Sequence, residues 1–130
     1  MAHRESSILV VDDNADIRDL LSFILEDEGY TVLTATEGEA ALAVIKESEP
    51  ELVLLDIMMP GRSGIDILKE VRSSKRESIN QTPIVMITAK SQVADIDEAL
   101  EAGATSYIVK PFRAEALLEK VQSFLPQTIK

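Results

Sequence analysis

Three aspartates each follow directly on a short apolar segment, and their carboxylates could form a site for phosphoryl-transfer chemistry. Asp12 and Asp13 come after residues 8–11, and Asp56 comes after residues 52–55. If these carboxylates lie close together they repel one another, so a cation is needed to keep them all ionised. Mg²⁺ suits such a set, because it binds one or two carboxylates together with phosphate oxygens and water. The three aspartates therefore predict a Mg²⁺ site.

A hydroxyl and an amine also stand directly after apolar segments. Thr88 follows residues 84–87, and Lys110 follows residues 106–109. In phosphoryl transfer a nucleophile lines up behind phosphorus while a metal ion and a lysine hold the equatorial oxygens. Asp56 lies centrally in the predicted set and can attack phosphorus to form an acyl phosphate. The Thr88 hydroxyl can then donate a hydrogen bond to one phosphoryl oxygen, and Lys110 can pair with another.

The elements that would position these residues follow from the spacing of apolar side chains. Of five short apolar segments, those that begin at residues 8, 52 and 84 are continuous, which is typical of strands buried on both faces of a parallel sheet. The segment at 31–35 alternates more, which predicts an edge strand. Stripes with helical spacing separate the strands, most clearly near 17–25 and 117–125.

Strand and helix alternate five times, which requires right-handed crossovers and helices on both faces of the sheet. We predict an α/β fold with a doubly wound five-stranded parallel sheet of order 2-1-3-4-5, a flavodoxin-like (βα)5, three-layer αβα architecture. Gly29 and Gly103 are expected to end helices as left-handed caps. The polar stretch 73–81 predicts an exposed loop. Ligands bind such sheets at the carboxyl ends of the strands, where the polar residues above converge.

Each of these polar residues has a simpler structural explanation when taken alone. Asp13 or Asn14 can cap the following helix, and a lone aspartate such as Asp56 is common after a strand. Thr88 has a residue type that strands favour, and Lys110 could be a surface charge. Their coincidence at one edge of the predicted sheet is what indicates a functional site.

Composition bounds the class of protein. The chain has 130 residues, 45% of them hydrophobic and 28% charged, which fits one domain with a core over about residues 7–125. Cysteine is absent, which excludes disulfides and thiolate catalysis. The formal net charge of −10 repels a phosphate backbone, so we expect no direct nucleic-acid binding. No apolar run approaches transmembrane length, so we expect a cytoplasmic protein without membrane contact.

Four motifs, VVDDN, LLDIMMPGRSG, IVMITAK and YIVKPF, occur in this order. Together they resemble the CheY-like receiver domains of two-component response regulators, over about residues 8–125. The resemblance implies a single receiver domain across the chain. It also implies that Asp56 accepts the phosphoryl group, and that Asp12, Asp13 and the main-chain carbonyl of Met58 bind Mg²⁺.

The resemblance further implies a conformational switch. Thr88 and Tyr107 would be the switch pair, with Lys110 contacting the phosphate ahead of a cis bond to Pro111. In this family phosphorylation remodels the face made by the fourth helix, fifth strand and fifth helix, as a bistable element biased by new charge-assisted hydrogen bonds. Ala89 would leave room for this movement, although plain packing explains a small residue there equally well.

The implied partners are a sensor histidine kinase or a histidine phosphotransfer protein as phosphoryl donor, and a downstream target protein. The chain would be a monomer or a phosphorylation-dependent dimer. It would promote its own phosphorylation and dephosphorylation without turning over an external substrate. Met58 and Lys90 stand where family members tune the lifetime of the phosphoryl group. A single-domain messenger is our interpretation of the short tail after Leu125, with a receiver excised from a longer protein as the alternative.

Two other classes of protein share part of this pattern. A phosphatase of the haloacid dehalogenase type also uses an aspartyl nucleophile, but it places a general-acid aspartate two residues later, where this chain has Met58. A flavin- or nucleotide-binding module could share the fold. Its phosphate would then meet the turn at residues 12–14, whose two aspartates repel an anion.

Overall fold

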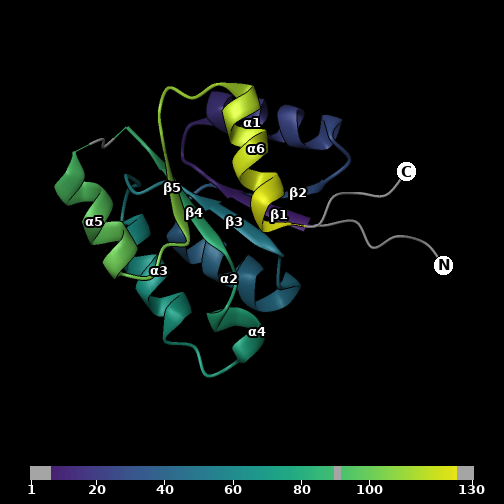
Figure 1. The fold of residues 1–130 in the computed structure, drawn as a ribbon. Helices are drawn as coiled ribbons and strands as arrows, with labels where there is room; N and C mark the ends of the chain where they lie inside the picture. The colour runs from purple at the N-terminus through teal and green to yellow at the C-terminus, as the bar shows by residue number, and fades with distance from the viewer. Residues whose placement is uncertain (1–6, 90–91, 126–130) are drawn as a thin grey trace.

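The computed structural model describes residues 7–89 and 92–125, and within them five parallel strands form one sheet (Figure 1). The order β2-β1-β3-β4-β5 confirms the predicted order. The chain crosses over between non-consecutive neighbours, so β1 and β3 lie side by side and their carboxyl ends meet at one edge. The strands are β1 (Ser7–Val11), β2 (Thr31–Ala35), β3 (Leu52–Leu55), β4 (Ile84–Thr88) and β5 (Ser106–Val109).

Helices cover both faces of the sheet, which gives the predicted three layers. Helices α1 and α6 pack on one face, and α2, α3 and α5 pack on the other (Figure 1). The helices are α1 (Ala15–Asp27), α2 (Gly38–Ser48), α3 (Gly64–Arg72), α4 (Glu77–Asn80), α5 (Val93–Glu101) and α6 (Ala114–Phe124). None of the helices in the described part of the chain is long and apolar enough to span a bilayer.

The continuous apolar runs are explained by the two separate cores. In β1 the side chains of Ile8 and Val10 enter the core beneath α1 and α6, whereas Leu9 and Val11 enter the other. Successive side chains of a strand point to opposite faces, so a strand covered on both sides must be apolar at every position. β2 is an edge strand, as predicted, and its residues Thr31 and Thr34 are exposed.

The stretch at 73–81 differs from the exposed loop that we predicted. It contains the short helix α4, and Ile79 in that helix is only 3% exposed. Ile79 joins the core beneath α2, α3 and α5. A single apolar side chain among polar neighbours gives no periodic signal, which explains why this helical turn was not predicted.

Helix ends follow the predicted chemistry. Asn14 is the N-cap of α1, and its side-chain oxygen accepts hydrogen bonds from the backbone N–H groups of Asp16 and Ile17 at 2.8 and 3.2 Å. Gly29 and Gly103 have φ of 97° and 112°, in the left-handed region that glycine adopts at little cost.

One arginine joins several segments at the amino ends of β4 and β5. The guanidinium of Arg72, at the end of α3, donates to the carbonyl oxygens of Asn80, Thr82 and Gly103 at 3.0, 2.7 and 2.8 Å, and to Thr105 Oγ1 at 3.3 Å. Partial burial lowers the pKa of Arg72. This arginine therefore fixes α4 and the connection from α5 to β5 against the end of α3.

Candidate functional site

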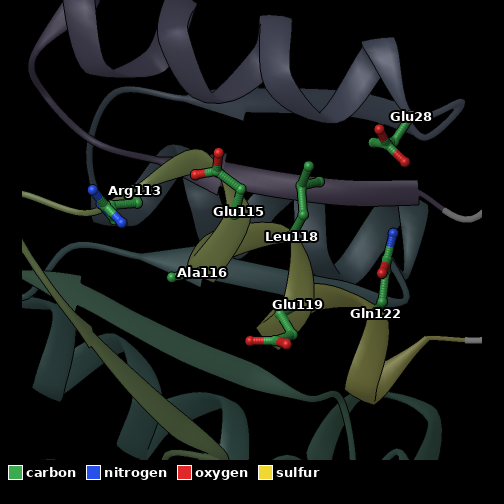
Figure 2. A pocket seen from close by; sticks show the side chains of 7 residues that line it. All are labelled: Glu28, Arg113, Glu115, Ala116, Leu118, Glu119 and Gln122. Atoms are coloured by element: carbon green, nitrogen blue, oxygen red, sulfur yellow. The ribbon is translucent and has the colours of Figure 1, made fainter.

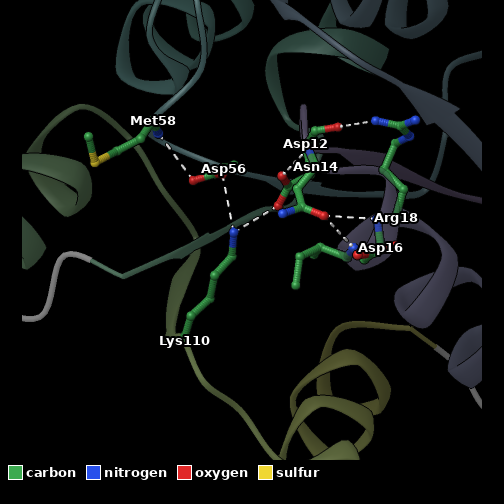
Figure 3. A network of polar contacts seen from close by, with 8 residues as sticks. Asp12, Asn14, Asp16, Arg18, Asp56, Met58 and Lys110 are labelled. Carbon is green, nitrogen blue, oxygen red and sulfur yellow. Dashed lines mark hydrogen bonds and ion pairs between the residues drawn. The ribbon is translucent and has the colours of Figure 1, made fainter.

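Asp12, Asp56 and Lys110, which the sequence predicted to converge, lie together at the carboxyl edge of the sheet (Figure 3). Asp12 and Asp13 follow β1, Asp56 follows β3, Thr88 ends β4 and Lys110 follows β5. One carboxylate oxygen from each aspartate lies within 4.8 Å of the others. The convergence predicted from strand order is thus present, and it brings together carboxylates that are as much as 44 positions apart, from 12 to 56, in the sequence.

Asp12 is only 2% exposed, and each of its polar atoms has a partner. Its backbone N–H donates to Ala35 O at 3.2 Å. Its carboxylate accepts from Asn14 N at 2.9 Å and from Lys110 Nζ at 2.8 Å. Its carbonyl oxygen accepts from Arg18 Nη1 at 2.9 Å. These four contacts hold Asp12 in one orientation, as expected for a buried polar residue.

Asp56 is 6% exposed and lies between two donors. The backbone N–H of Met58 donates to Oδ1 at 3.1 Å, and Lys110 Nζ donates to Oδ2 at 3.2 Å. Burial raises the pKa of Asp56, and the negative charge of Asp12 raises it further; the Met58 N–H and the Lys110 charge lower it without cancelling the rise. A cation beside this carboxylate therefore favours its ionised form.

Lys110 is the cation that the chain itself supplies to this edge. Burial lowers the pKa of its amine, but hydrogen bonding to Asp12 and the charges of Asp56 and Asp12 outweigh burial, so the pKa is raised. The ammonium thus stays charged between two carboxylates. The peptide bond from Lys110 to Pro111 is cis, as the resemblance implied.

The donor set fits Mg²⁺. Asp12, Asp13 and Asp56 offer three oxygens close together, and Asp13 is exposed, so that the cluster is open to solvent on one side. One ammonium cannot balance three carboxylates, and a small hard cation that takes oxygen ligands and keeps several waters can. The carbonyl ligand predicted at Met58 stays a prediction; its backbone adjoins Asp56 while its side chain is 58% exposed.

The residues predicted to form the switch lie on β4, β5 and their extensions. Thr88 is fully buried at the end of β4, and Ala89 after it is exposed. Tyr107 is half-buried on the edge strand β5, and its pKa is raised by burial, then by the negative charges of Asp95 and Asp56. Their roles in a switch remain predictions, and Lys90 lies outside the described residues.

Arg18 was not predicted as part of the site. It lies on α1, four residues after Asn14, so its side chain extends from the first turn of the helix back to Asp12. The sequence signal was weak, because arginine is common on exposed helix faces. Only the contact with Asp12 distinguishes Arg18 from such a residue.

A second hollow lies away from this edge and does not suit an anion. Figure 2 shows it beside α6, with a volume of about 460 Å³. Three of its seven lining residues are glutamates: Glu28, Glu115 and Glu119. Among the described residues, the carboxylates whose oxygens lie close enough together to hold a metal ion are those of Asp12, Asp13 and Asp56, so the aspartate cluster remains the candidate site.

Comparisons with known proteins agree with this geometry. The family model described as "Response regulator receiver domain" matches residues 8–122. The DNA-binding response regulator MtrA of Mycobacterium leprae (strain TN) and that of Mycobacterium tuberculosis (strain ATCC 25618 / H37Rv) are each 41% identical over 118 residues, covering 91% of this chain and 50% of the relative. The chain therefore spans about half the length of the curated relatives it matches.

Solved structures have a similar fold. Chemotaxis response regulator CheY4 of Vibrio cholerae is similar with a TM-score of 0.87 and 35% identity, covering 94% of this chain and 100% of that chain. A CheY-like response regulator receiver domain protein from Methanospirillum hungatei JF-1 has a TM-score of 0.84 and 32% identity, covering 92% and 93% of the two chains.

Proposed function

The chain belongs to the response regulator receiver family of two-component signalling, and on that premise we propose that Asp56 is its phospho-acceptor. One observation carries the assignment: Lys110 Nζ donates to both Asp56 and Asp12, so the Asp56 carboxylate lies beside a cation and close to the acidic pair. Among the three clustered aspartates, Asp56 alone follows the central strand β3.

The reaction follows from these contacts. A carboxylate oxygen of Asp56 attacks phosphorus, the bond from phosphorus to the donor's leaving atom breaks, and that atom keeps the bonding electron pair. Asp12, Asp13 and Asp56 would hold Mg²⁺, which would neutralise charge on the phosphoryl oxygens. The Lys110 ammonium, three donors on a flexible stem, can turn from the carboxylates to a phosphoryl oxygen, and the Thr88 hydroxyl can donate to another.

Response regulators act with histidine kinases, and the surface beside Asp56 suits a protein donor. A hollow of about 380 Å³ adjoins Lys110 and has an almost wholly apolar lining that includes Ile17, Leu20 and Phe112. Leu20 is 47% exposed, so this apolar surface is available to a partner. We propose a sensor histidine kinase or a histidine phosphotransfer protein as the donor.

The proposed output is a change in the face formed by α5, β5 and α6. These are the fourth helix, fifth strand and fifth helix of the family pattern, because the short α4 adds one to the count here. In this proposal Thr88 moves toward the phosphoryl group and Tyr107 turns inward, with Ala89 leaving space. A downstream target protein then distinguishes the two states of this face, and binding energy must favour one of them.

Intact mass spectrometry tests the acceptor. Incubation with acetyl phosphate and Mg²⁺ should add one phosphoryl group to the wild-type chain, and chelation of the metal should prevent the addition. Asp56→Asn should not acquire the group, because an amide is a poor nucleophile. Asp97→Asn, which changes an exposed aspartate on α5, serves as the matched control and should be phosphorylated normally. An undiminished adduct in Asp56→Asn would show that another residue is the acceptor.

The same preparation tests whether the chain turns over an external substrate. A phosphatase of the haloacid dehalogenase type needs a proton donor two residues after its nucleophile, and Met58 offers none. We expect no multiple turnover of a small phosphate ester such as p-nitrophenyl phosphate. Sustained release of nitrophenol that is lost in Asp56→Asn would favour the phosphatase instead.

A further inference from the structure

We infer that Arg18 is a positioning residue for the metal site, because its guanidinium holds the peptide group between Asp12 and Asp13 and so sets how tightly the aspartates bind Mg²⁺. This inference deepens the proposed function and rests on it. It concerns a side chain that itself is not a metal ligand in the proposal.

The contact is well defined. Arg18 Nη1 donates to the carbonyl oxygen of Asp12 at 2.9 Å (Figure 3). The backbone N–H of Arg18 donates to Asn14 O at 3.0 Å, which fixes its place in the first turn of α1. Asn14 in turn caps that helix and bonds the carboxylate of Asp12 through its own backbone N–H. The turn from β1 into α1 is therefore closed by contacts at both ends.

This contact acts on Asp13 through the geometry of the peptide group. The Asp12 carbonyl and the Asp13 N–H belong to one planar unit, so a donor that fixes the carbonyl also fixes the direction in which the chain enters Asp13. Asp13 is exposed, in contrast to Asp12 and Asp56, and so has fewer packing contacts to hold it. Its carboxylate nevertheless lies within 4.8 Å of the other two.

The hydrogen bond of Arg18 and its positive charge predict opposite changes in Mg²⁺ affinity when the side chain is replaced. A guanidinium near the cluster repels a divalent cation, so the loss of its charge alone would tighten Mg²⁺ binding. The loss of the hydrogen bond would free the peptide group and weaken binding. Partners of this outer kind typically change metal affinity by about 10- to 100-fold. We therefore expect the positional effect to exceed that of one partly solvated charge.

The test is the dissociation constant of Mg²⁺ for the unphosphorylated full chain, measured by calorimetric titration and by amide shifts in NMR spectra. Arg18→Met keeps much of the side chain's length but has no donor, and should bind Mg²⁺ about tenfold more weakly. Arg18→Lys retains the charge and one donor able to reach a carbonyl, and should recover part of the loss. Arg62→Met is the control, since Arg62 is a surface cation paired with Glu39 and Glu70; its affinity should be unchanged or slightly tighter.

Unchanged or tighter binding in Arg18→Met would overturn the inference and leave the proposed function intact. Circular dichroism shows whether Arg18→Met folds. If it does not fold, Arg18→Lys is the deciding variant: a Mg²⁺ affinity equal to that of the wild type, with an unchanged amide shift at Asp13, would show that the guanidinium is not required. If the wild type binds no Mg²⁺, the metal site of the proposed function fails together with this inference. When the wild type does bind Mg²⁺, Asp13→Asn is the positive control: its affinity should fall whatever the role of Arg18, which shows that the titration reports the aspartate site.

Discussion

Burial and neighbouring groups act on the ionisation of Asp56, the proposed acceptor. Asp56 lies almost entirely inside the molecule. Burial and the negative charge of Asp12 raise the pKa of its carboxyl above the ordinary value, even though the Met58 N–H and Lys110 stabilise the anion. An ionised group in such a place lowers the stability of the folded chain. Burial therefore favours the neutral form of Asp56, although the proposed function requires its carboxylate.

The first prediction concerns pH. Because the pKa of Asp56 is higher in the folded than in the unfolded state, ionisation costs stability: the cost is absent below the unfolded pKa, grows as pH rises from the unfolded towards the folded pKa, and is complete above the folded pKa. Without Mg²⁺, the stability of Asp56→Asn relative to the wild type should therefore be greater near pH 7 than at acid pH, where the wild-type carboxyl is protonated in both the folded and the unfolded state. Urea unfolding across this range measures it. A difference in the free energy of unfolding that does not change with pH would contradict a raised pKa of Asp56.

A second prediction concerns the glycine that begins α3. A Cβ at Gly64 would overlap the main-chain oxygen of Asp56 and lie 2.9 Å from the Cα of Ile57. Gly64→Ala should therefore displace the backbone of Asp56, lower stability by about 2 kcal/mol and slow phosphorylation by acetyl phosphate. Gly61→Ala is the comparison: φ there is +78° and nothing lies within 4 Å, so it should cost only about 1 kcal/mol of strain and leave phosphorylation nearly normal. Equal phosphorylation rates in the two variants would argue against this crowding.

At the scale of elements, Arg72 joins α4 to the two connections that lead into β4 and β5. Its guanidinium donates hydrogen bonds to three carbonyl oxygens, those of Asn80, Thr82 and Gly103. Removal of a donor from partly buried carbonyls leaves them unsatisfied, which costs more than the bond itself contributes.

The third prediction follows. Arg72→Met should lower the free energy of unfolding by about 2 kcal/mol and speed hydrogen exchange of the Thr105 amide, which bonds Ile84 O at 2.7 Å. Arg76→Met is matched in chemistry but removes an exposed ion pair with Glu49, so its effect should stay below about 1 kcal/mol. Comparable losses of stability in the two variants would show that Arg72 is an ordinary surface arginine.

The elements themselves were largely predictable, and the arginines were not. Continuous apolar runs identify strands because burial on both faces leaves a local mark on the sequence, and strand order then places Asp12, Asp56 and Lys110 together. The contacts of Arg18 and Arg72 with carbonyl oxygens leave no such mark, since any segment offers carbonyls and only tertiary packing selects which are reached. The short helix α4 was missed for another reason, since Ile79 is a single apolar side chain among polar neighbours and gives no periodic pattern.

At the scale of the molecule, charge restricts the partners. Thirteen basic against 23 acidic residues give a formal net charge of −10. The MtrA relatives are named as DNA-binding proteins, and this chain spans about half their length. We propose that the matched half is not the part that contacts DNA, because an acidic surface repels a polyanion.

The fourth prediction is therefore an absence of binding. Fluorescence polarisation with a labelled duplex at about 150 mM salt should show no complex, with or without acetyl phosphate. A lower salt concentration should not produce a complex, because weaker screening strengthens the repulsion between the acidic chain and the DNA phosphates. Mg²⁺ is best varied separately because it can bridge two anions. Binding that weakens steeply with added salt would reveal a basic patch that the net charge conceals.

The shared ammonium of Lys110 has a mechanical consequence. In the sheet β5 pairs with β4 and not with β1 or β3. The Lys110 side chain, which follows β5, nevertheless donates hydrogen bonds to Asp12 after β1 and to Asp56 after β3. We propose that a displacement of this ammonium is passed along the lysine side chain to the connection between β5 and α6, so that α6 responds to a change at the end of β3. This coupling lasts only while Lys110 contacts both carboxylates.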